Sequence, residues 1–158
     1  MISLIVAYDK NKLIGGGGKM PWDIKSELRR FRELTTGNVV IMGRKTYESI
    51  GSKPLPDRIN IIVSSSLRLN DENCFSVGSI EEAIEAAKKT GKEIYISGGS
   101  TIYEKVMDIV DVMYITEIDA EFEGDVYFPE FDESLFTKEI VEHIDEDIPY
   151  TYVTYTRK

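Results

Sequence analysis

The sequence predicts a single α/β domain over residues 1–158, with a central, mostly parallel twisted sheet, helices on both faces and an antiparallel C-terminal edge. Two observations support this. Apolar segments of strand length alternate with helical segments as far as residue 119, the order that builds a parallel sheet. The last two apolar segments follow each other without a helix and alternate apolar with polar residues, which is typical of antiparallel pairing.

The first predicted strand is the apolar run of residues 1–8 (MISLIVAY), because continuous Ile- and Val-rich runs of this length are typical of strands buried on both faces. The first predicted helix begins near Asp23, a potential N-cap. Its apolar residues recur every three positions. They are Leu28, Phe31 and Leu34.

The alternation continues through the rest of the chain. Further strands are expected over 37–43, 59–66, 92–97 and 110–119, and the two edge strands over 136–144 and 150–158. Helices are expected over 46–50, over 79–91 and directly after the glycine turn at 98–99. The helix over 79–91 has the clearest limits, since Ser79 and Glu82 have the spacing of a capping box and Gly91 is a stop signal.

The formal net charge of −9 argues against nucleic acid as a partner, because phosphate binding needs a basic contact face. The charge is unevenly distributed, however. Residues 1–70 contain 12 Lys and Arg against 6 Asp and Glu, whereas residues 71–158 contain 7 against 22. The first part could therefore attract an anionic small molecule, and ordinary solvated surface charge is the alternative explanation.

Composition also favours a cytoplasmic protein that needs no metal and no membrane, and we expect a monomer. No apolar run reaches the roughly 18 residues of a membrane span, and residues 1–8 lack the basic start of a signal peptide. The single cysteine, Cys74, cannot form an intramolecular disulfide and is expected to be a small apolar side chain. With only one histidine, His143, a zinc site is not expected.

Two glycine-rich stretches are candidates for phosphate-binding loops. The run Gly15–Gly18 fits neither a dinucleotide fingerprint nor a Walker A motif, because both need a different residue at Met20. The turn over 97–100 (SGGS) is better placed, between a predicted strand and a predicted helix. Helix N-termini offer free amides and a positive dipole to a phosphate. A tight turn without any ligand is the alternative.

Glu27 is a candidate for a functional acid. It lies one helical turn before Phe31 on the apolar face of the predicted helix. Burial of an unpaired charge is costly, so such a carboxylate is usually matched to a ligand that donates hydrogen bonds. An acid in the first turn of a helix that only interacts with the helix dipole is the alternative.

Taken together, six segments in this order resemble the dihydrofolate reductase family along essentially the whole chain. They are VAYDKNKLIG (6–15), MPWDIKSELRRF (20–31), VIMGRKTYESIG (40–51), PLPDRINIIVSS (54–65), YISGGSTIYE (95–104) and YITEIDAEFEGDVYFP (114–129). The resemblance implies reduction of 7,8-dihydrofolate to 5,6,7,8-tetrahydrofolate, with hydride transfer from NADPH to C6 and protonation at N5. It also implies a supply of tetrahydrofolate for one-carbon metabolism and binding of antifolates such as trimethoprim or methotrexate.

Mapped by motif, the resemblance implies that Glu27 is the acid beneath the pterin and that Thr116 holds its carboxylate. Many bacterial relatives have an aspartate at the position of Glu27, which leaves the fine placement of the ring open. Arg58 would bind the α-carboxylate of the glutamate tail in a bidentate pair. The other residues expected at the substrate are Ile5, Val6, Ala7, Leu28, Phe31, Ile50, Leu55, Ser97 and Tyr103.

For the cofactor, the resemblance implies that Arg44, Lys45 and Ser65 surround the 2′-phosphate, which favours NADPH over NADH. It also implies a cis peptide bond between Gly98 and Gly99. The full set of residues expected at NADPH is Ala7, Ile14, Gly15, Gly43, Arg44, Lys45, Thr46, Ser64, Ser65, Ser97, Gly98, Gly99, Ser100, Thr101 and Ile102.

The resemblance gives the loop over 12–23 a role as a lid in which Met20 and Trp22 cover the reacting rings. Four glycines are more than relatives generally have, which predicts a looser lid. No side chain is expected to protonate N5, so water admitted past Met20 is the expected proton donor. Two alternatives share the cofactor residues: an NADPH-dependent reductase of another pterin or a pyrimidine, and a non-catalytic NADPH-binding module.

Overall fold

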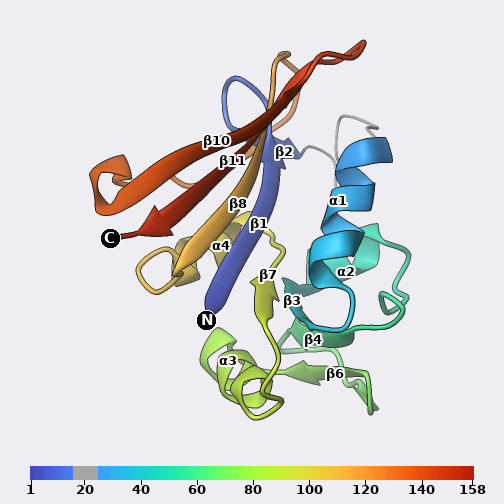
Figure 1. The fold of residues 1–158 in the computed structure, drawn as a ribbon. Coiled ribbons are helices and arrows are strands. Elements are labelled where there is room, and N and C mark those ends of the chain that lie inside the picture. The colour runs from blue at the N-terminus through green and yellow to red at the C-terminus, as the bar shows by residue number, and fades with distance from the viewer. Residues whose placement is uncertain (16–24) are drawn as a thin grey trace.

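One large sheet forms the centre of the structure (Figure 1). The computed structural model describes residues 1–15 and 25–158, without the side chains of 25–27. Within these residues the strand order is β10-β11-β8-β1-β7-β3-β4-β6-β5. The strands are β1 (Ile2–Tyr8), β3 (Val39–Gly43), β4 (Ile59–Val63), β5 (Asn70–Asp71), β6 (Cys74–Val77), β7 (Ile94–Ile96), β8 (Val112–Ile118), β10 (Phe136–Ile144) and β11 (Tyr150–Arg157).

The pairing of the strands confirms the predicted fold class. The pairs β8-β1, β1-β7, β7-β3, β3-β4 and β4-β6 are parallel, whereas β11 pairs antiparallel with both β8 and β10. Every residue of β1 is buried, as expected for a central strand covered on both faces. A second, two-stranded sheet joins β2 (Leu13–Gly15) to β9 (Val126–Tyr127).

Helices cover both faces of the sheet, as predicted. In Figure 1, α1 (Lys25–Thr35) and α2 (Arg44–Ser49) lie on one side, and α3 (Ile80–Lys88) and α4 (Ser100–Val106) on the other. Ser79 caps α3 by accepting a hydrogen bond from the Glu82 amide at 3.1 Å. The Glu82 carboxylate accepts from the Gly78 amide at 3.0 Å, one residue earlier than in a standard capping box. None of the helices in the described residues has the length and apolar character to cross a bilayer.

Several element limits differ from the expectation. The strand expected over 59–66 ends at Val63, because the Ser64 hydroxyl accepts hydrogen bonds from the amides of Ser66 and Leu67 and turns the chain. Helix α2 begins at Arg44 rather than at residue 46. The short strand β6 was not predicted, since its four residues become a strand by pairing with β4.

The parallel strands bring their carboxyl ends to one edge of the sheet, where α/β proteins bind ligands. Ala7 at the end of β1 lies opposite Thr116 on β8. At the end of β3, the Gly43 amide donates to the Gly98 carbonyl at 2.8 Å and so joins β3 to the turn after β7. Segments from four parts of the chain therefore meet at this edge.

Asn60 anchors the turn before β4. It is fully buried, and its side-chain oxygen accepts from the Leu55 amide at 2.8 Å. Its side-chain nitrogen donates to the carbonyls of Leu55, Arg58 and Asn73. Removal of a buried partner leaves such backbone groups unsatisfied, so Asn60 holds the segment that carries Arg58.

Replacement of this anchor should be costly. We expect Asn60→Ala to lower the free energy of unfolding by about 2–4 kcal/mol, because buried polar groups of the turn lose their partner. Urea denaturation of the two proteins measures the difference. Asn11→Ala, at an exposed position, is the matched control and should change stability by less than about 0.5 kcal/mol. Equal effects of the two substitutions would contradict the anchoring role.

Candidate active site

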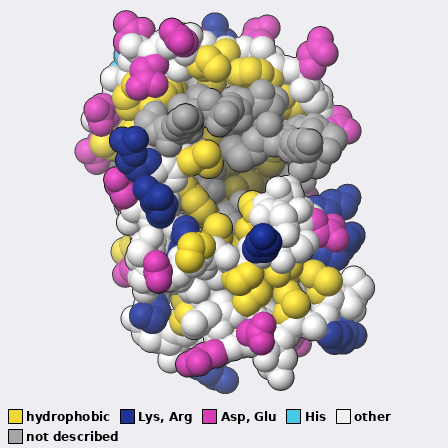
Figure 2. Space-filling model, turned by 90° about the vertical axis from the view of Figure 1, so that its right-hand side faces the viewer, with side chains coloured by type: hydrophobic (Ala, Val, Ile, Leu, Met, Phe, Trp, Pro, Cys, Tyr) yellow, Lys and Arg dark blue, Asp and Glu magenta, His cyan; other side chains and the backbone are white. Residues whose placement is uncertain are grey.

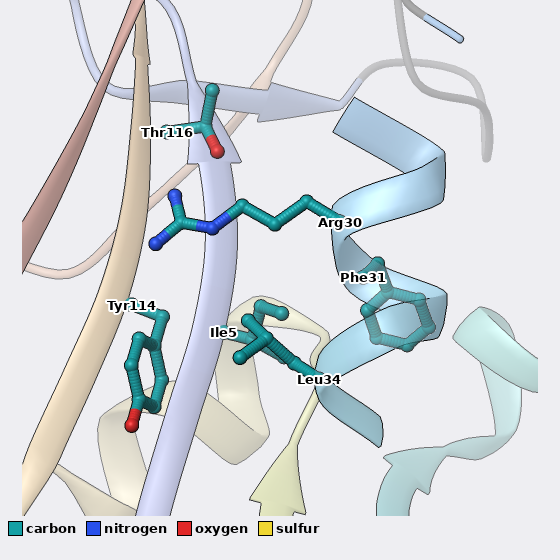
Figure 3. Close-up of a pocket in the computed structure, with 6 residues that line it drawn as sticks. All are labelled: Ile5, Arg30, Phe31, Leu34, Tyr114 and Thr116. Carbon is teal, nitrogen blue, oxygen red and sulfur yellow. The ribbon is translucent and has the colours of Figure 1, made fainter. Parts of the chain in front are cut away.

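A narrow pocket lies between α1 and the strands β1 and β8 at this edge (Figure 3). Its two strands face each other in register, with Ile5 opposite Tyr114 and Ala7 opposite Thr116. Thr116 is almost fully buried. The residues that line the pocket are Ile5, Arg30, Phe31, Leu34, Tyr114 and Thr116. The structure thus brings together Ile5, Phe31 and Thr116, three of the residues expected at the substrate.

The expected acid lies at the start of the helix that borders this pocket. The backbone of Glu27 belongs to the first turn of α1, but its side chain falls outside the described residues. Met20 and Trp22, the expected lid residues, also lie outside them. Their predicted roles therefore rest on the resemblance and on where α1 places position 27.

Apolar side chains surround the pocket on the face that carries α1 and α2. Leu28 and Ile50 are exposed to 52% and 40%, whereas Phe31 and Leu55 pack partly buried against the core around Met42. Figure 2 shows hydrophobic side chains (yellow) on this face beside the grey residues, with lysine and arginine (blue) on its flanks. Exposed apolar area next to a pocket suits a flat aromatic ligand.

Arg58 lies buried beyond the C-terminal end of α1. Its Nε donates to the Pro56 carbonyl at 2.9 Å, and its Nη1 donates to the Thr35 hydroxyl at 3.1 Å. Burial lowers the pKa of the guanidinium; the negative charge of Asp57 opposes this shift, and the positive charge of Arg32 adds to it. A buried arginine held in this way is suited to bind a carboxylate, and sequence alone would have placed it at the surface.

The glycine turn after β7 has the predicted cis peptide bond between Gly98 and Gly99. A β-carbon on Gly98, whose φ is +117°, would lie 3.2 Å from the Tyr103 hydroxyl. That hydroxyl donates to the Ile5 carbonyl at 2.8 Å. Tyr103 therefore supports the turn and ties it to β1, a structural contact in addition to the substrate contact implied by the resemblance.

The expected cofactor residues lie along the ends of β3, β4 and β7. Gly43 and Val63 are neighbours in the sheet, so helix α2, from Arg44, and the turn at Ser64 begin side by side. Arg44 pairs with Glu48 at 2.9 Å, and a β-carbon on Gly99 would lie 3.5 Å from the Thr46 hydroxyl.

These residues fit a phosphate-bearing dinucleotide, because close backbone approaches and cations meet at one edge. The other residues expected at the cofactor differ in their exposure to solvent. Lys45, Ser65 and Thr101 are exposed, Ser97 and Ser100 are half-buried, Ile102 is buried, and Ile14 and Gly15 belong to β2. The Ser64 oxygen is engaged by the turn already described. Val6 faces the core cluster formed with α3 and α4, so it reaches a ligand at this edge only through its backbone.

Two charged residues near the edge were not singled out from sequence. Asp9 is buried, and its carboxylate accepts from the amides of Asn11, Leu13 and Phe122 at 2.8 to 2.9 Å, which joins the start of β2 to the chain after β8. Arg30 reaches into the pocket (Figure 3). Its position three residues after Glu27 was the signal that could have identified it.

Comparison with known proteins agrees with this geometry. A family model described as dihydrofolate reductase matches residues 1–157. A dihydrofolate reductase of Bacillus subtilis is 41% identical over 154 residues, which is 96% of this chain and 90% of that protein. A dihydrofolate reductase of Staphylococcus aureus is 37% identical over 161 residues, with 99% and 98% covered.

A similar solved structure is the dihydrofolate reductase of Enterococcus faecalis complexed with NADP(H) and the compound RAB-propyl. It superimposes with a TM-score of 0.91 at 35% identity and covers 99% of this chain and 96% of that one. Family model, relatives and structure agree over nearly the full length of the chain. The chain therefore belongs to the dihydrofolate reductase family of NADPH-dependent oxidoreductases.

Proposed function

We propose that this chain reduces 7,8-dihydrofolate to 5,6,7,8-tetrahydrofolate with NADPH, and that its substrate lies along α1. The observation that carries the proposal is the arrangement at the two ends of this helix. Position 27 lies in its first turn, one turn before Arg30 and Phe31, which line the pocket together with Thr116. Its last residue, Thr35, accepts a hydrogen bond from the buried Arg58. Eight residues of helix separate the two ends by about 12 Å, which suits a ligand with a ring system at one end and a carboxylate at the other.

At the ring end, Glu27 would accept hydrogen bonds from the ring nitrogen and the 2-amino group of the pterin, with the Thr116 hydroxyl donating to the same carboxylate. The negative charge stabilises the pterin once N5 is protonated. Water is the proposed proton donor, since Glu27 is expected on the side of the ring away from N5. Ile5, Phe31 and Leu28 would pack against the ring system.

At the cofactor end, NADPH supplies a hydride to C6 of the substrate when it is bound. Arg44, Lys45 and Ser65 would hold its 2′-phosphate. Thr46 and the amides of residues 98–101 would hold the pyrophosphate, at the turn where Gly43 donates to the Gly98 carbonyl.

We also propose that residues 1–158 act as one monomeric domain in the cytoplasm. Both halves of the chain contribute to the central sheet and to the proposed site, which supports a single domain. The one cysteine, Cys74, is buried, as expected in a protein that does not depend on disulfides. The closure of Met20 and Trp22 over the site stays a prediction for residues outside those that the structure describes.

The role of Glu27 can be tested by an isosteric change. We expect Glu27→Gln to fold but to lose at least about 100-fold in turnover at neutral pH, because the charge that stabilises the protonated pterin is removed. Turnover is measured by the loss of nicotinamide absorbance after enzyme, NADPH and dihydrofolate are mixed. Glu33→Gln, at an exposed position of the same helix, is the matched control. Near-normal turnover of Glu27→Gln would exclude the proposed role.

Recognition of the glutamate tail depends on the planar guanidinium of Arg58. We expect Arg58→Lys to lower kcat/KM for dihydrofolate by roughly 30-fold, since a lysine cannot form the bidentate pair. For dihydropteroate, which lacks the glutamate, the change should stay within about threefold. Arg29→Lys, an exposed arginine of α1, is the control. Equal losses for the two substrates would show that Arg58 acts only through the fold.

The preference for NADPH over NADH is expected to depend on Arg44. Arg44→Ala should lower kcat/KM for NADPH by roughly 10- to 100-fold and leave that for NADH nearly unchanged, because a charge-assisted contact to one phosphate is lost. Glu48→Gln removes the 2.9 Å partner of Arg44 and should not weaken NADPH binding. The same loss with both cofactors would argue against a contact to the 2′-phosphate.

A further inference from the structure

Arg30 places a positive charge inside the active-site pocket. It is half-buried on α1, and its guanidinium carbon lies 3.8 Å from the centre of the Tyr152 ring. A guanidinium stacked on an aromatic face at this distance is held by cation–π attraction. Tyr152 is itself buried and packs in the core cluster with Ala7, so the platform that holds the cation is part of the fold.

The stacked cation lies next to the residue expected to hold the substrate acid. Tyr152 on β11 is the direct neighbour of Thr116 on β8 in the antiparallel register, and directly opposed side chains lie about 4.5–5.5 Å apart at their β-carbons. Figure 3 shows the Arg30 side chain extending from α1 across β1 toward Thr116 and Tyr114. Arg30 and Thr116 line the same pocket.

Other ionisable groups lie near Arg30 on α1, on β8 and on the β10–β11 hairpin. On the solvent side Arg30 borders a groove between α1 and the β10–β11 hairpin, and on the inner side Tyr114 of β8 lines the pocket. The ionisable residues of the groove are Arg29 and Glu33 on α1, Glu142 on β10, Glu146 in the connection, and Tyr150 and Tyr152 on β11. The three glutamates are exposed, so water screens them, whereas the stack keeps the guanidinium at the inner wall.

Position 27 lies on the same face of α1 as Arg30, one turn earlier, because residues three apart are neighbours on a helix surface. We propose that Arg30 is a positioning residue for the reaction: stacked on Tyr152 beside Thr116, it keeps a positive charge next to the acid at position 27. The inference rests on the proposed role of Glu27 and adds a residue to it. It needs no further ligand, since the groups involved belong to α1, β8 and β11.

The charge has a definite effect on the pH dependence of the reaction. A nearby cation favours the ionised form of a carboxylate and disfavours a second positive charge, here a protonated N5 of the substrate. Both effects move the midpoint of the pH dependence of hydride transfer to lower pH. Removal of the charge should therefore move its midpoint to higher pH, and a change of packing alone would not.

The test compares Arg30→Met and Arg30→Gln, which remove the charge, with Arg30→Lys, which keeps it. Single-turnover hydride transfer from NADPH to dihydrofolate is followed from pH 5 to pH 9 for each variant. We expect the midpoint to rise by roughly half to one pH unit in Arg30→Met and Arg30→Gln, and Arg30→Lys to remain near the parent. Arg29→Met makes the same change of charge at the neighbouring, exposed position and should leave the midpoint within about 0.2 units.

Two variants without the charge are used so that the test can still be read if one of them fails to fold. An unchanged midpoint in the folded variants, or an equal shift in Arg29→Met, would overturn the inference. The proposed function fails separately: if Glu27→Gln keeps the turnover of the parent, the assignment of the acid is wrong whatever the Arg30 variants do. The role of Arg30 alone would be rejected by one combination of results. In it the parent enzyme is active, Glu27→Gln is inactive, and the pH midpoint of Arg30→Met equals that of the parent.

Discussion

Parallel pairing of β1 with β7 on one side and with β8 on the other is the constraint on which the site depends. It places Ala7 opposite Thr116, and the parallel pairing of β7 with β3 sets the Ser97–Gly99 turn beside the end of β3. A slip of one residue in either pair would turn every side chain to the other face of the sheet. Substrate residues on β8 and cofactor residues after β3 and β7 thus share one edge because three strands run in the same direction.

Electrostatics near the site differ from those of the whole chain. The protein has a net charge of −9, yet two buried or half-buried cations lie at α1: Arg30 on the helix and Arg58 beside its last residue. Arg58 is held by a hydroxyl and a carbonyl, and Arg30 by an aromatic ring. A guanidinium held by such contacts keeps its positive charge, so it can act on an anionic ligand or a neighbouring acid.

The accuracy of the sequence prediction varied with the origin of each element. Strand β1 and helix α3 were predicted closely because their signals are local: a continuous apolar run, and a cap at Ser79 with a glycine stop. Strand β6 and the end of β4 were not, because both depend on partners far along the chain or on the Ser64 side chain. The roles of Asp9 and Arg30 depend in the same way on Phe122 and Tyr152.

By itself the sequence determined the fold class, the family and the set of residues expected to bind substrate and cofactor, since apolar periodicity and motif order are local properties of the chain. Only the tertiary structure decided that Arg58 is buried, that Tyr103 supports the glycine turn and that Arg30 stacks beside Thr116. These are contacts between segments up to about 120 residues apart. Their formation depends on the register of the sheet and on the packing of α1 against it, which no local pattern specifies.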